Sequence, residues 1–275
     1  MELDHLEHCM GTPIVPSEDC AVQEFYDAFA PYYDDFYDLI DYAEWARVIQ
    51  SHIPSVENNT RKILEIGCGT GSLLTELRKH DDQIIFGLDL SDEMLRRCLA
   101  KVGTDAKPPL IQSDALFSCF LPNSFDVVIG NFSLLNHFEQ VKRRQLLREV
   151  FAVLRTNGVF VTDFATLARY RQLVRQSSET ESVKKESQIA EISQTFFQVL
   201  ATELGKSRNS GDSFWLERTL TTINSCVKKR LYFFNRAEIT LDFCTVGFQI
   251  VEQSSPVRDS FDHAPNRIML VARKP

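Results

Sequence analysis

The stretch Glu65-Ile66-Gly67-Cys68-Gly69-Thr70-Gly71 decides the fold, because it joins an apolar segment to a helical one. The run from Lys62 to Ile66 predicts a buried strand, and Ser72 to Lys79 has the pattern of a helix. Glycines in the turn let the backbone bend sharply and approach a ligand, which also meets the N-terminal N–H groups of the helix. The sequence therefore predicts a ligand-binding loop at the carboxyl end of a strand.

The spacing of these glycines excludes a dinucleotide-binding fingerprint, and with it a dehydrogenase. That fingerprint, Gly-x-Gly-x-x-Gly, would place its third glycine at position 72, which is a serine here. Glu65 would repel a pyrophosphate, so a cationic or zwitterionic ligand suits the loop better. Asp89 ends the next expected strand, Gln83 to Leu88, where a carboxylate either binds both hydroxyls of a ribose or only caps the following helix.

Strands and helices alternate along the chain up to Phe164, which predicts an α/β fold with a mostly parallel sheet. Further strands are expected at 110–111, 125–130 and 159–164. Helices are expected at 42–53, 92–101 and 139–154. Asn157 and Gly158 are expected to cap the C-terminus of the last of these helices. In 21–38 two short helical pieces are expected, interrupted at Pro31. After Phe164 the pattern indicates a polar stretch, β-rich segments at 213–222 and 227–234, a helix at 236–246 and closing strands at 247–253 and 267–273.

Composition and charge narrow the possible functions. Of the 275 residues 44% are hydrophobic and 25% charged, an ordinary globular balance, and the net charge of −8 argues against a nucleic-acid binder. No apolar run approaches the length of a membrane helix, and the acidic start of the chain does not resemble a signal peptide. The seven cysteines form no Cys-x-x-Cys pair, so reduced thiols, a cytoplasmic location and no metal site are expected.

Charged residues cluster in three places. Twelve Asp or Glu and no Lys or Arg occur between Met1 and Glu44, either as a solvated arm or as a negative field near a site for a cationic substrate. The basic clusters at 142–144 and 228–230 are expected to be solvated surface.

From about Tyr26 to Pro275 the chain resembles the class I S-adenosylmethionine-dependent methyltransferases. The matching segments are Ile63–Gly71, Ile85–Leu95, Gln112–Ala115, Phe125–Ile129 and Leu154–Gly158. The resemblance implies a Rossmann-like, seven-stranded, mostly parallel sheet with an antiparallel last strand, helices on both faces and a cap inserted after the fifth strand.

Within that resemblance we expect one domain over 1–275. Its parts are a loose N-terminal arm (1–20), N-terminal lid helices (21–60), a cofactor-binding core (61–164), a cap or flap insertion (165–235), and a closing helix and strand hairpin (236–275).

The resemblance also implies S-adenosyl-L-methionine as cofactor and no metal. Glycines of the loop would line its methionine part, and Asp89 would bind its ribose. Leu90 and Met94 would flank its adenine, and Tyr33 would cover the cofactor as a lid. The full set of cofactor-binding residues implied is Tyr33, Glu65, Gly67, Cys68, Gly69, Gly71, Asp89, Leu90, Met94, Ser113, Asp114, Ala115 and Asn131.

The acceptor side is less well defined by sequence. An Asn-Pro-Pro-Tyr motif is absent from Gly130–Phe138, the segment after the fourth strand. His137 resembles a histidine of sugar-amine N-methyltransferases and is the candidate general base, the alternative being a structural histidine that caps the next helix. The candidate substrate-binding residues are Phe132, Trp215 and Tyr232.

We therefore expect methyl transfer to an amine or hydroxyl of a small molecule by in-line displacement, without nucleic acid or membrane, and with the oligomeric state open. The alternatives are a protein or tRNA methyltransferase and a non-catalytic, methyltransferase-like binding partner.

Overall fold

The computed structural model describes residues 18–53, 60–80, 82–102, 108–117, 119–168, 214–221, 226–254 and 267–275. Side chains are described from residue 21 onward within these ranges, except those of 214–221 and 226. Most of the expected N-terminal arm and the segment 169–213 of the expected cap therefore lie outside the described residues.

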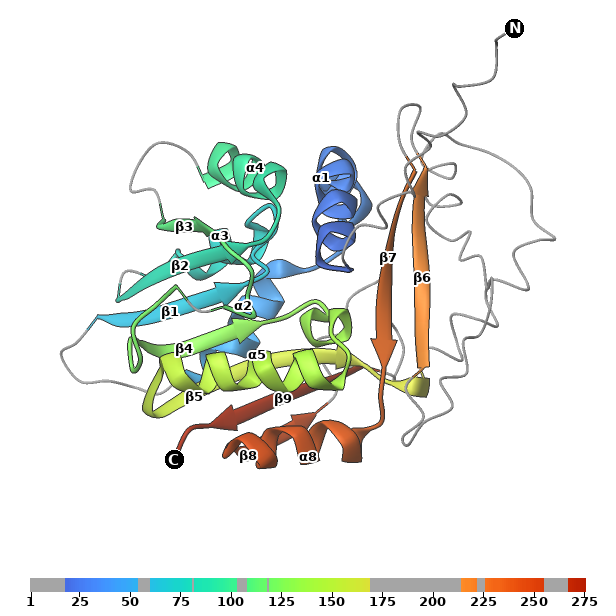
Figure 1. Ribbon diagram of the computed structural model, residues 1–275. Helices are drawn as coiled ribbons and strands as arrows, with labels where there is room; N and C mark the ends of the chain where they lie inside the picture. The colour runs from blue at the N-terminus through green and yellow to red at the C-terminus, as the bar shows by residue number, and fades with distance from the viewer. Residues whose placement is uncertain are drawn as a thin grey trace, which may run out of the picture.

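A seven-stranded sheet forms the centre of the molecule (Figure 1). Its strands are β1 (Arg61–Ile66), β2 (Gln83–Asp89), β3 (Leu110–Gln112), β4 (Phe125–Gly130), β5 (Leu154–Ala165), β8 (Gln249–Ser254) and β9 (Arg267–Arg273). Their order is β3-β2-β1-β4-β5-β9-β8. The first five strands run parallel, and β9 is antiparallel to both β5 and β8. The expected Rossmann-like sheet is thus confirmed.

Helices cover both faces of this sheet, which explains why successive residues are buried along β1, β4, β5 and β9. Successive side chains of a strand point to opposite faces, so Ile63 packs with one layer and Leu64 with the other. The first layer contains α2 (Tyr42–His52), α3 (Ser72–Leu77) and α4 (Asp92–Val102). The second contains α5 (Gln140–Val153) and α8 (Arg236–Val246). The carboxyl ends of the parallel strands remain as the edge where a ligand can bind.

One continuous helix, α1 (Glu18–Phe36), replaces the two pieces expected around Pro31, so that prediction was wrong. A proline inside a helix removes one hydrogen bond, but packing of a buried face can compensate for the loss. Phe25 and Phe29 are fully buried and pack with Tyr33 and with Val227 of a distant strand, whereas Pro31 is exposed. Contacts formed only in the folded chain therefore keep the helix intact.

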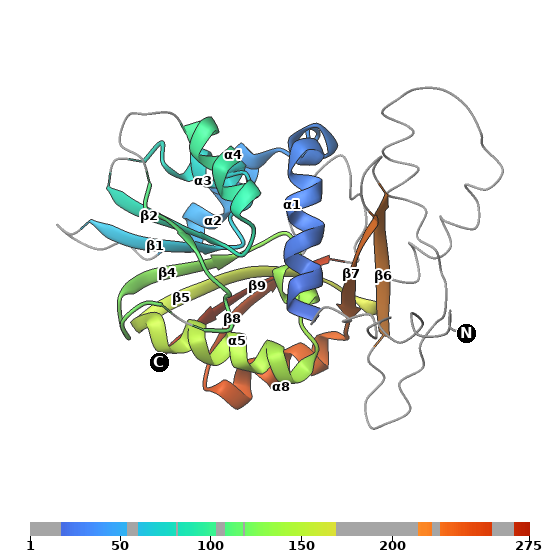
Figure 2. The same cartoon turned by 45° about the horizontal axis from the view of Figure 1, so that its top comes forward.

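A second, two-stranded sheet stands beside α1, as Figures 1 and 2 show. It consists of β6 (Phe214–Thr221) and β7 (Cys226–Phe233), paired antiparallel with Phe214 opposite Phe233. The expected antiparallel flap is confirmed. Because β7 contacts α1, two segments about two hundred positions apart in the sequence lie side by side here.

The start of β5 differs from the expectation that Asn157 and Gly158 cap the preceding helix. The helix α5 already ends at Val153, and β5 begins at Leu154. The register against β4 shifts after Phe125, and Asn157 has a φ of 64° inside this irregular part of the strand. Its N–H donates to the carbonyl of Lys274 at 2.8 Å, so the residue joins the sheet to the C-terminal segment.

Candidate functional site

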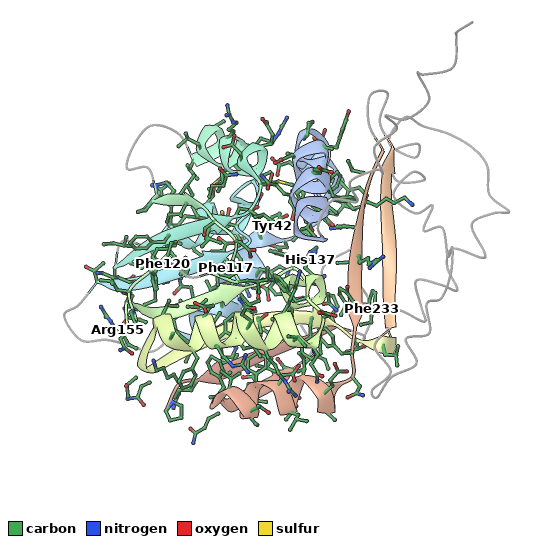
Figure 3. All side chains as sticks on the ribbon, viewed as in Figure 1. Tyr42, Phe117, Phe120, His137, Arg155 and Phe233 are labelled. Atoms are coloured by element: carbon green, nitrogen blue, oxygen red, sulfur yellow. The ribbon has the colours of Figure 1, made fainter. Side chains whose placement is uncertain are left out.

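A cavity of about 440 Å³ lies at the carboxyl ends of the parallel strands. Its walls come from the glycine loop after β1, the ends of β2, β3 and β4, the helix α1, the strand β7 and the 3-10 turn η1 (Leu134–His137). Figure 3 shows His137 in this region, where α1 and β7 converge on the edge of the sheet. The cavity is therefore built from the core of the sheet and from two distant segments of the chain, α1 and β7.

The glycine loop requires its glycines. Gly67, Gly69 and Gly71 all have positive φ values of 71°, 54° and 78°, a region that residues with a Cβ rarely adopt. The N–H of Gly69 donates to Oδ2 of Asp89 at 2.8 Å, and the N–H of Ser91 donates to Oδ1 at 2.9 Å. The loop after β1 and the end of β2 are thus held together by one carboxylate that lines the cavity.

The nucleoside end of the cavity contains most of the residues expected there. Those that line it are Asp89, Leu90, Met94, Ser113, Asp114 and Ala115. Oδ1 of Asp114 accepts a hydrogen bond from the N–H of Leu116 at 2.9 Å, which fixes this acid at the cavity wall. Burial raises the pKa of Asp89, partly offset by the hydrogen bonds from Ser91 and Gly69. A carboxylate beside apolar side chains is the environment that a ribose and an adenine ring need.

Three residues of the expected cofactor set do not line the cavity. Gly71 faces Cys98, since a Cβ on Gly71 would lie 2.3 Å from Sγ of Cys98. Cys68 packs against β2, because its Sγ lies 2.9 Å from where a Cβ of Gly87 would be. Glu65 is 4% exposed, and burial raises the pKa of its carboxyl well above the usual value. These three residues shape the loop from behind, and their direct contact with a cofactor stays a prediction.

Asn131 fits a ligand with an amino-acid moiety. Its side chain lines the cavity and is 6% exposed, yet neither its amide nitrogen nor its oxygen has a hydrogen-bond partner among the described residues. Buried polar groups without partners are rare, because each costs about 1–3 kcal/mol. The amide offers a donor to a carboxylate and an acceptor to an ammonium, the two groups of the methionine part of S-adenosyl-L-methionine.

The helix α1 covers the loop through carboxylates and a tyrosine. The ring of Tyr33 lies 3.9 Å from where a Cβ of Gly69 would be, and the residue lines the cavity, while its role as a lid over the cofactor stays a prediction. Asp27 accepts a hydrogen bond from the hydroxyl of Ser91 at 2.5 Å. Asp34 accepts one from the hydroxyl of Thr70 at 2.6 Å and pairs with Lys101 at 2.7 Å. Two acids of the acidic N-terminal stretch thus attach the lid to the core.

At the acceptor end, His137 forms a chain of contacts with Tyr26 and Lys229. The hydroxyl of Tyr26 lies 3.1 Å from Nε2 of His137, and the ammonium of Lys229 donates to the same hydroxyl at 2.5 Å. Lys229 is 5% exposed, and its ammonium lies 4.0 Å from the ring centroid of Tyr26 and 4.5 Å from that of Phe25. Because an ammonium only donates, we assign the proton of the Tyr26 hydroxyl to the bond with His137.

The structure shows whether His137 caps the next helix, and it corrects the prediction that the basic cluster 228–230 is solvated. The helix after His137 begins at Gln140 with Glu139 as its N-cap residue, so His137 does not cap it. Lys229 is buried at the cavity, whereas the basic cluster 228–230 was expected to be solvated. Neither Tyr26 nor Lys229 was identified as a site residue, although the aromatic-rich segment 21–38 and the basic triplet 228–230 were each visible in the sequence.

Two of the three expected substrate-binding residues line the cavity, and the side chain of the third is not described. Phe132 and Tyr232 line the cavity. The ring of Phe132 also packs on Trp45 and Tyr42 of α2, with centroids 5.1 and 5.5 Å away. The backbone of Trp215 pairs with Tyr232 in the β6–β7 sheet, but its side chain lies outside the described residues.

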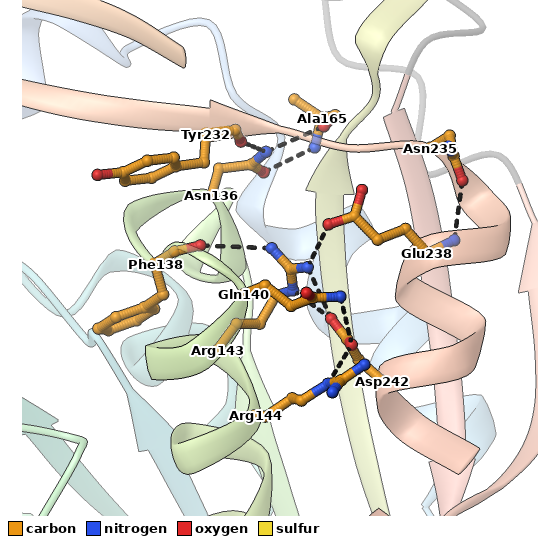
Figure 4. A network of polar contacts seen from close by, with 10 residues as sticks. All are labelled: Asn136, Phe138, Gln140, Arg143, Arg144, Ala165, Tyr232, Asn235, Glu238 and Asp242. Carbon is orange, nitrogen blue, oxygen red and sulfur yellow. Dashed lines mark hydrogen bonds and ion pairs between the residues drawn. The ribbon is translucent and has the colours of Figure 1, made fainter. Parts of the chain in front are cut away.

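A buried amide fixes the acceptor wall (Figure 4). The side-chain nitrogen of Asn136 donates to the carbonyls of Ala165 at 2.9 Å and Tyr232 at 2.5 Å, and its oxygen accepts from the N–H of Ala165 at 2.8 Å. Asn136 is fully buried, so these bonds form out of water. They hold η1, the end of β5 and β7 at fixed positions, and with them His137.

A buried ion-pair network joins α5 to α8 behind this wall (Figure 4). Arg143 is 1% exposed and pairs with Asp242 at 2.6 Å and Glu238 at 2.7 Å, and Arg144 also pairs with Asp242 at 2.6 Å. The guanidinium of Arg143 lies 4.1 Å from the ring centroid of Phe234. The expectation that 142–144 is solvated surface is therefore wrong for Arg143.

The chain is similar to known proteins over part or most of its length. Residues 63–158 match the family described as a methyltransferase domain. The chain is 23% identical over 251 residues to the putative methyltransferase YqeM of Bacillus subtilis, covering 90% of this chain and 97% of that protein. It is 31% identical over 159 residues to an uncharacterized protein of Methanocaldococcus jannaschii, covering 58% of this chain and 57% of that protein. The chain thus spans little more than half the length of this second relative.

A solved structure shares the fold. The S-adenosylmethionine-dependent methyltransferase from Clostridium acetobutylicum superposes with a TM-score of 0.60 at 17% identity, over 90% of this chain and 98% of that one. Residues 63–158 of this chain are thus similar to a methyltransferase domain, and the chain has the fold of that solved methyltransferase.

Two searches of the described residues gave negative results. No helix within those ranges is long and apolar enough to cross a membrane. No group of three or more His, Cys, Asp or Glu side chains in the same part of the chain is arranged to hold a metal ion.

Proposed function

We propose that this protein transfers a methyl group to an amine or hydroxyl of a small molecule by in-line displacement. The observation that carries the proposal is that one cavity contains both the cofactor residues and the Tyr26–His137–Lys229 contacts. A cavity of about 440 Å³ has the size of a small-molecule site. The net charge of −8 supports a small acceptor in the cytoplasm over an RNA.

The chain's own residues would hold the cofactor at the edge of the sheet. Asp89 would bind the ribose hydroxyls, Met94 would contact the adenine, and Asn131 would bind the amino-acid end beside Gly67 and Gly69. When bound, S-adenosyl-L-methionine supplies a methyl group activated by a sulfonium. Tyr33 and the rest of α1 would exclude water from this end, and the fixed walls would align the acceptor with the methyl group.

The acceptor atom must lose a proton, and Tyr26 with His137 can take it. The hydroxyl oxygen of Tyr26 would accept the proton of the acceptor, while its own proton passes to Nε2 of His137. Lys229 donates to the same oxygen and stabilises negative charge on it during the transfer. This role requires a neutral imidazole, which a histidine provides near neutral pH.

The test begins with cofactor binding. Calorimetry with S-adenosyl-L-methionine and S-adenosylhomocysteine should give binding by the wild type and its loss in Asp89→Ala. A panel of amines and alcohols is then screened for release of S-adenosylhomocysteine, and the methylated atom is located by mass spectrometry. Absence of cofactor binding in a folded wild-type sample would refute the proposal. Methylation only of carboxylates or carbon would refute the amine or hydroxyl acceptor.

The proton-transfer residues are tested with matched variants. Tyr26→Phe and His137→Asn should each lower kcat by about 10²–10⁴, the usual contribution of general acid–base catalysis, with cofactor affinity unchanged. Tyr32→Phe is the control, because Tyr32 lies on the same helix, is 37% exposed and does not line the cavity. An equal loss in Tyr32→Phe would mean that the effect comes from α1 as a whole.

A further inference from the structure

We infer that α1 is a gate over the cofactor end of the cavity, held closed by two of its aspartates, and that its opening also separates the proposed proton-transfer pair. Asp27 bonds to Ser91 of the core, an attachment called here the Asp27 latch. Asp34 bonds to Thr70 and Lys101 of the core, called here the Asp34 latch. The inference rests on the proposed function, because it concerns ligand exchange and proton transfer in the same cavity.

The sequence of α1 contains a tyrosine followed by an aspartate twice, as Tyr26-Asp27 and as Tyr33-Asp34. Seven residues are close to two turns of a helix, so the two tyrosines share one face and the two aspartates share the neighbouring one. Both tyrosines line the cavity, whereas both aspartates bond to the core. The helix is therefore attached beside the cavity at two points, two turns apart.

The Asp34 latch joins α1 to the glycine loop. Oδ1 of Asp34 accepts hydrogen bonds from the hydroxyl of Thr70 at 2.6 Å and from the ammonium of Lys101 at 2.7 Å. The same ammonium donates to the hydroxyls of Thr70 at 3.0 Å and Ser72 at 2.7 Å. Thr70 is 1% exposed and directly follows Gly69. Because hydrogen bonds to charged groups are stronger than neutral ones, this latch holds α1 firmly at the loop.

The Asp27 latch joins α1 to the segment after β2. Oδ1 of Asp27 accepts hydrogen bonds from the hydroxyl of Ser91 at 2.5 Å and from the N–H of Glu93 at 3.4 Å. The N–H of Ser91 donates to Asp89, and its hydroxyl accepts from the N–H of Met94 at 3.1 Å. Asp89 and Met94 both line the cavity. This latch therefore connects α1 to the residues expected to bind the nucleoside.

The two latches place α1 against both loops that are expected to hold the cofactor. Thr70 follows Gly69, and Ser91 bonds to Asp89, so α1 and these two loops bound the same end of the cavity. A ligand held there leaves when α1 moves away. Both partners of each latch belong to the chain, so the bonds oppose the entry of a ligand as well as its release. The latches should therefore slow both steps and change the affinity little.

Tyr26 moves with this gate, because α1 is one continuous helix. The hydroxyl of Tyr26 lies 3.1 Å from Nε2 of His137, which belongs to η1. Opening of α1 therefore separates Tyr26 from His137, and the pair forms again when α1 closes. Proton transfer and exchange of the cofactor would thus take place at different times.

Stopped-flow binding of S-adenosylhomocysteine tests the gate. Asp34→Ala should raise both the association and the dissociation rate constant about tenfold or more, with Kd within about threefold of the wild type. Asp35→Ala is the matched control, since Asp35 is the next acid on α1, is exposed and belongs to neither latch. Rate constants equal to those of the control would overturn the inference. Faster dissociation alone, with weaker affinity, would indicate a direct contact with the ligand and would also overturn it.

Two substitutions of Thr70 separate the latch from a general loss of packing. Thr70 does not line the cavity, so neither substitution removes a contact with the ligand. Thr70→Val removes the hydroxyl and should raise both rate constants about threefold or more, because Asp34 keeps only Lys101. Thr70→Ser keeps the hydroxyl and should stay near the wild type. The same rate constants in both variants would show that the bond from Thr70 to Asp34 does not hold the gate.

Amide hydrogen exchange of the protein without ligand tests the gate independently of the proposed function. Pro31 interrupts the backbone bonds of α1, so the helix depends on its contacts for stability. Exchange along α1 should accelerate about tenfold or more in the double variant Asp27→Ala, Asp34→Ala relative to Asp35→Ala. Equal exchange would overturn the inference. A folded wild type that binds no S-adenosylhomocysteine would instead refute the proposed function, and hydrogen exchange would still decide the gate.

The imidazole NMR signal of His137 tests the coupling to Tyr26. The signal is assigned by its absence in His137→Asn, and Tyr26→Phe shows where it lies once the contact is lost. In Asp34→Ala it should move toward that position, although Asp34 belongs to the latch at the other end of the cavity. In Asp35→Ala it should stay at the wild-type position. An unchanged signal in Asp34→Ala would overturn the coupling of the gate to proton transfer.

Discussion

Replacing Gly71 with alanine should destabilise the protein by about 2–5 kcal/mol. The φ of 78° at Gly71 costs a residue with a Cβ about 1–2 kcal/mol. The new Cβ would also lie 2.3 Å from Sγ of Cys98, an overlap that must be relieved by movement, at about 1–3 kcal/mol. The two costs arise from different atoms, so they can be separated by a second substitution.

Cys98→Ala removes the sulfur and leaves Cβ of Cys98 as the nearest atom, at 3.3 Å. By itself this variant should lose about 1 kcal/mol, the value of a small buried apolar group. In the double variant the overlap with sulfur is gone, whereas the cost of the positive φ remains. The double variant should therefore be about 1–3 kcal/mol more stable than the sum of the single effects predicts.

The assay is urea unfolding of the wild type, both single variants and the double variant, analysed as a double-mutant cycle. Gly71→Ala combined with Cys244→Ala is the control, because Cys244 is exposed and should give additive effects. A coupling free energy below about 0.5 kcal/mol between positions 71 and 98 would refute the reasoning, since additivity is expected only for residues that do not touch.

Three further predictions follow from buried polar groups. Asp242→Ala should lower the free energy of unfolding by about 3–5 kcal/mol, because Arg143 stays buried with only Glu238 of its two carboxylate partners and Arg144 loses the same carboxylate, and a loss below about 1 kcal/mol in urea unfolding would contradict this. Asn136→Ala should cost about 2–4 kcal/mol, because the N–H and carbonyl of Ala165 both lose a bond, and amide hydrogen exchange at Ala165 should accelerate. Burial raises the pKa of Glu65, so the contribution of Glu65 to stability should be complete below the unfolded pKa of about 4.3 and be lost as the pH rises through the raised folded pKa. Glu65→Gln should lack this contribution, so its free energy of unfolding should fall less between pH 4.5 and 8 than that of the wild type. Parallel curves of the free energy of unfolding against pH for the two apo proteins would show that the Glu65 carboxyl does not cause the difference.

The fold could be predicted wherever local pattern determines structure. The bounds of β4, α8 and β9 agree with the expected ranges, since each is a periodic apolar segment between turn residues. The continuity of α1 across Pro31 could not be predicted, because it depends on Phe25 and Phe29 packing near a strand two hundred positions away. Local propensity indicates a break there, and tertiary packing overrides it.

The candidate site likewise has one part that could be predicted from local sequence and one part that depends on the fold. The cofactor end was predictable because its residues follow strand ends in consecutive motifs, and Asp89 and Asp114 line the cavity as expected. The acceptor end was only partly identified, because the proposed role of His137 depends on its contact with Tyr26 and, through Tyr26, on Lys229. Tyr26 and Lys229 are 203 positions apart in the sequence. A basic triplet in a sequence indicates surface, and only the fold shows that its central lysine is buried against aromatic rings.

The distance along the chain between Tyr26 and Lys229 has a consequence for how such a protein can evolve. The cavity residues expected to bind the nucleoside lie between Ile66 and Ala115, whereas the opposite wall is assembled from α1, η1, α5 and β7. If the proposed function holds, exchange of the β6–β7 segment would alter which molecule is methylated and leave the expected donor site as it is. New acceptors can be acquired by replacing a single hairpin, without rebuilding the machinery that binds the methyl donor.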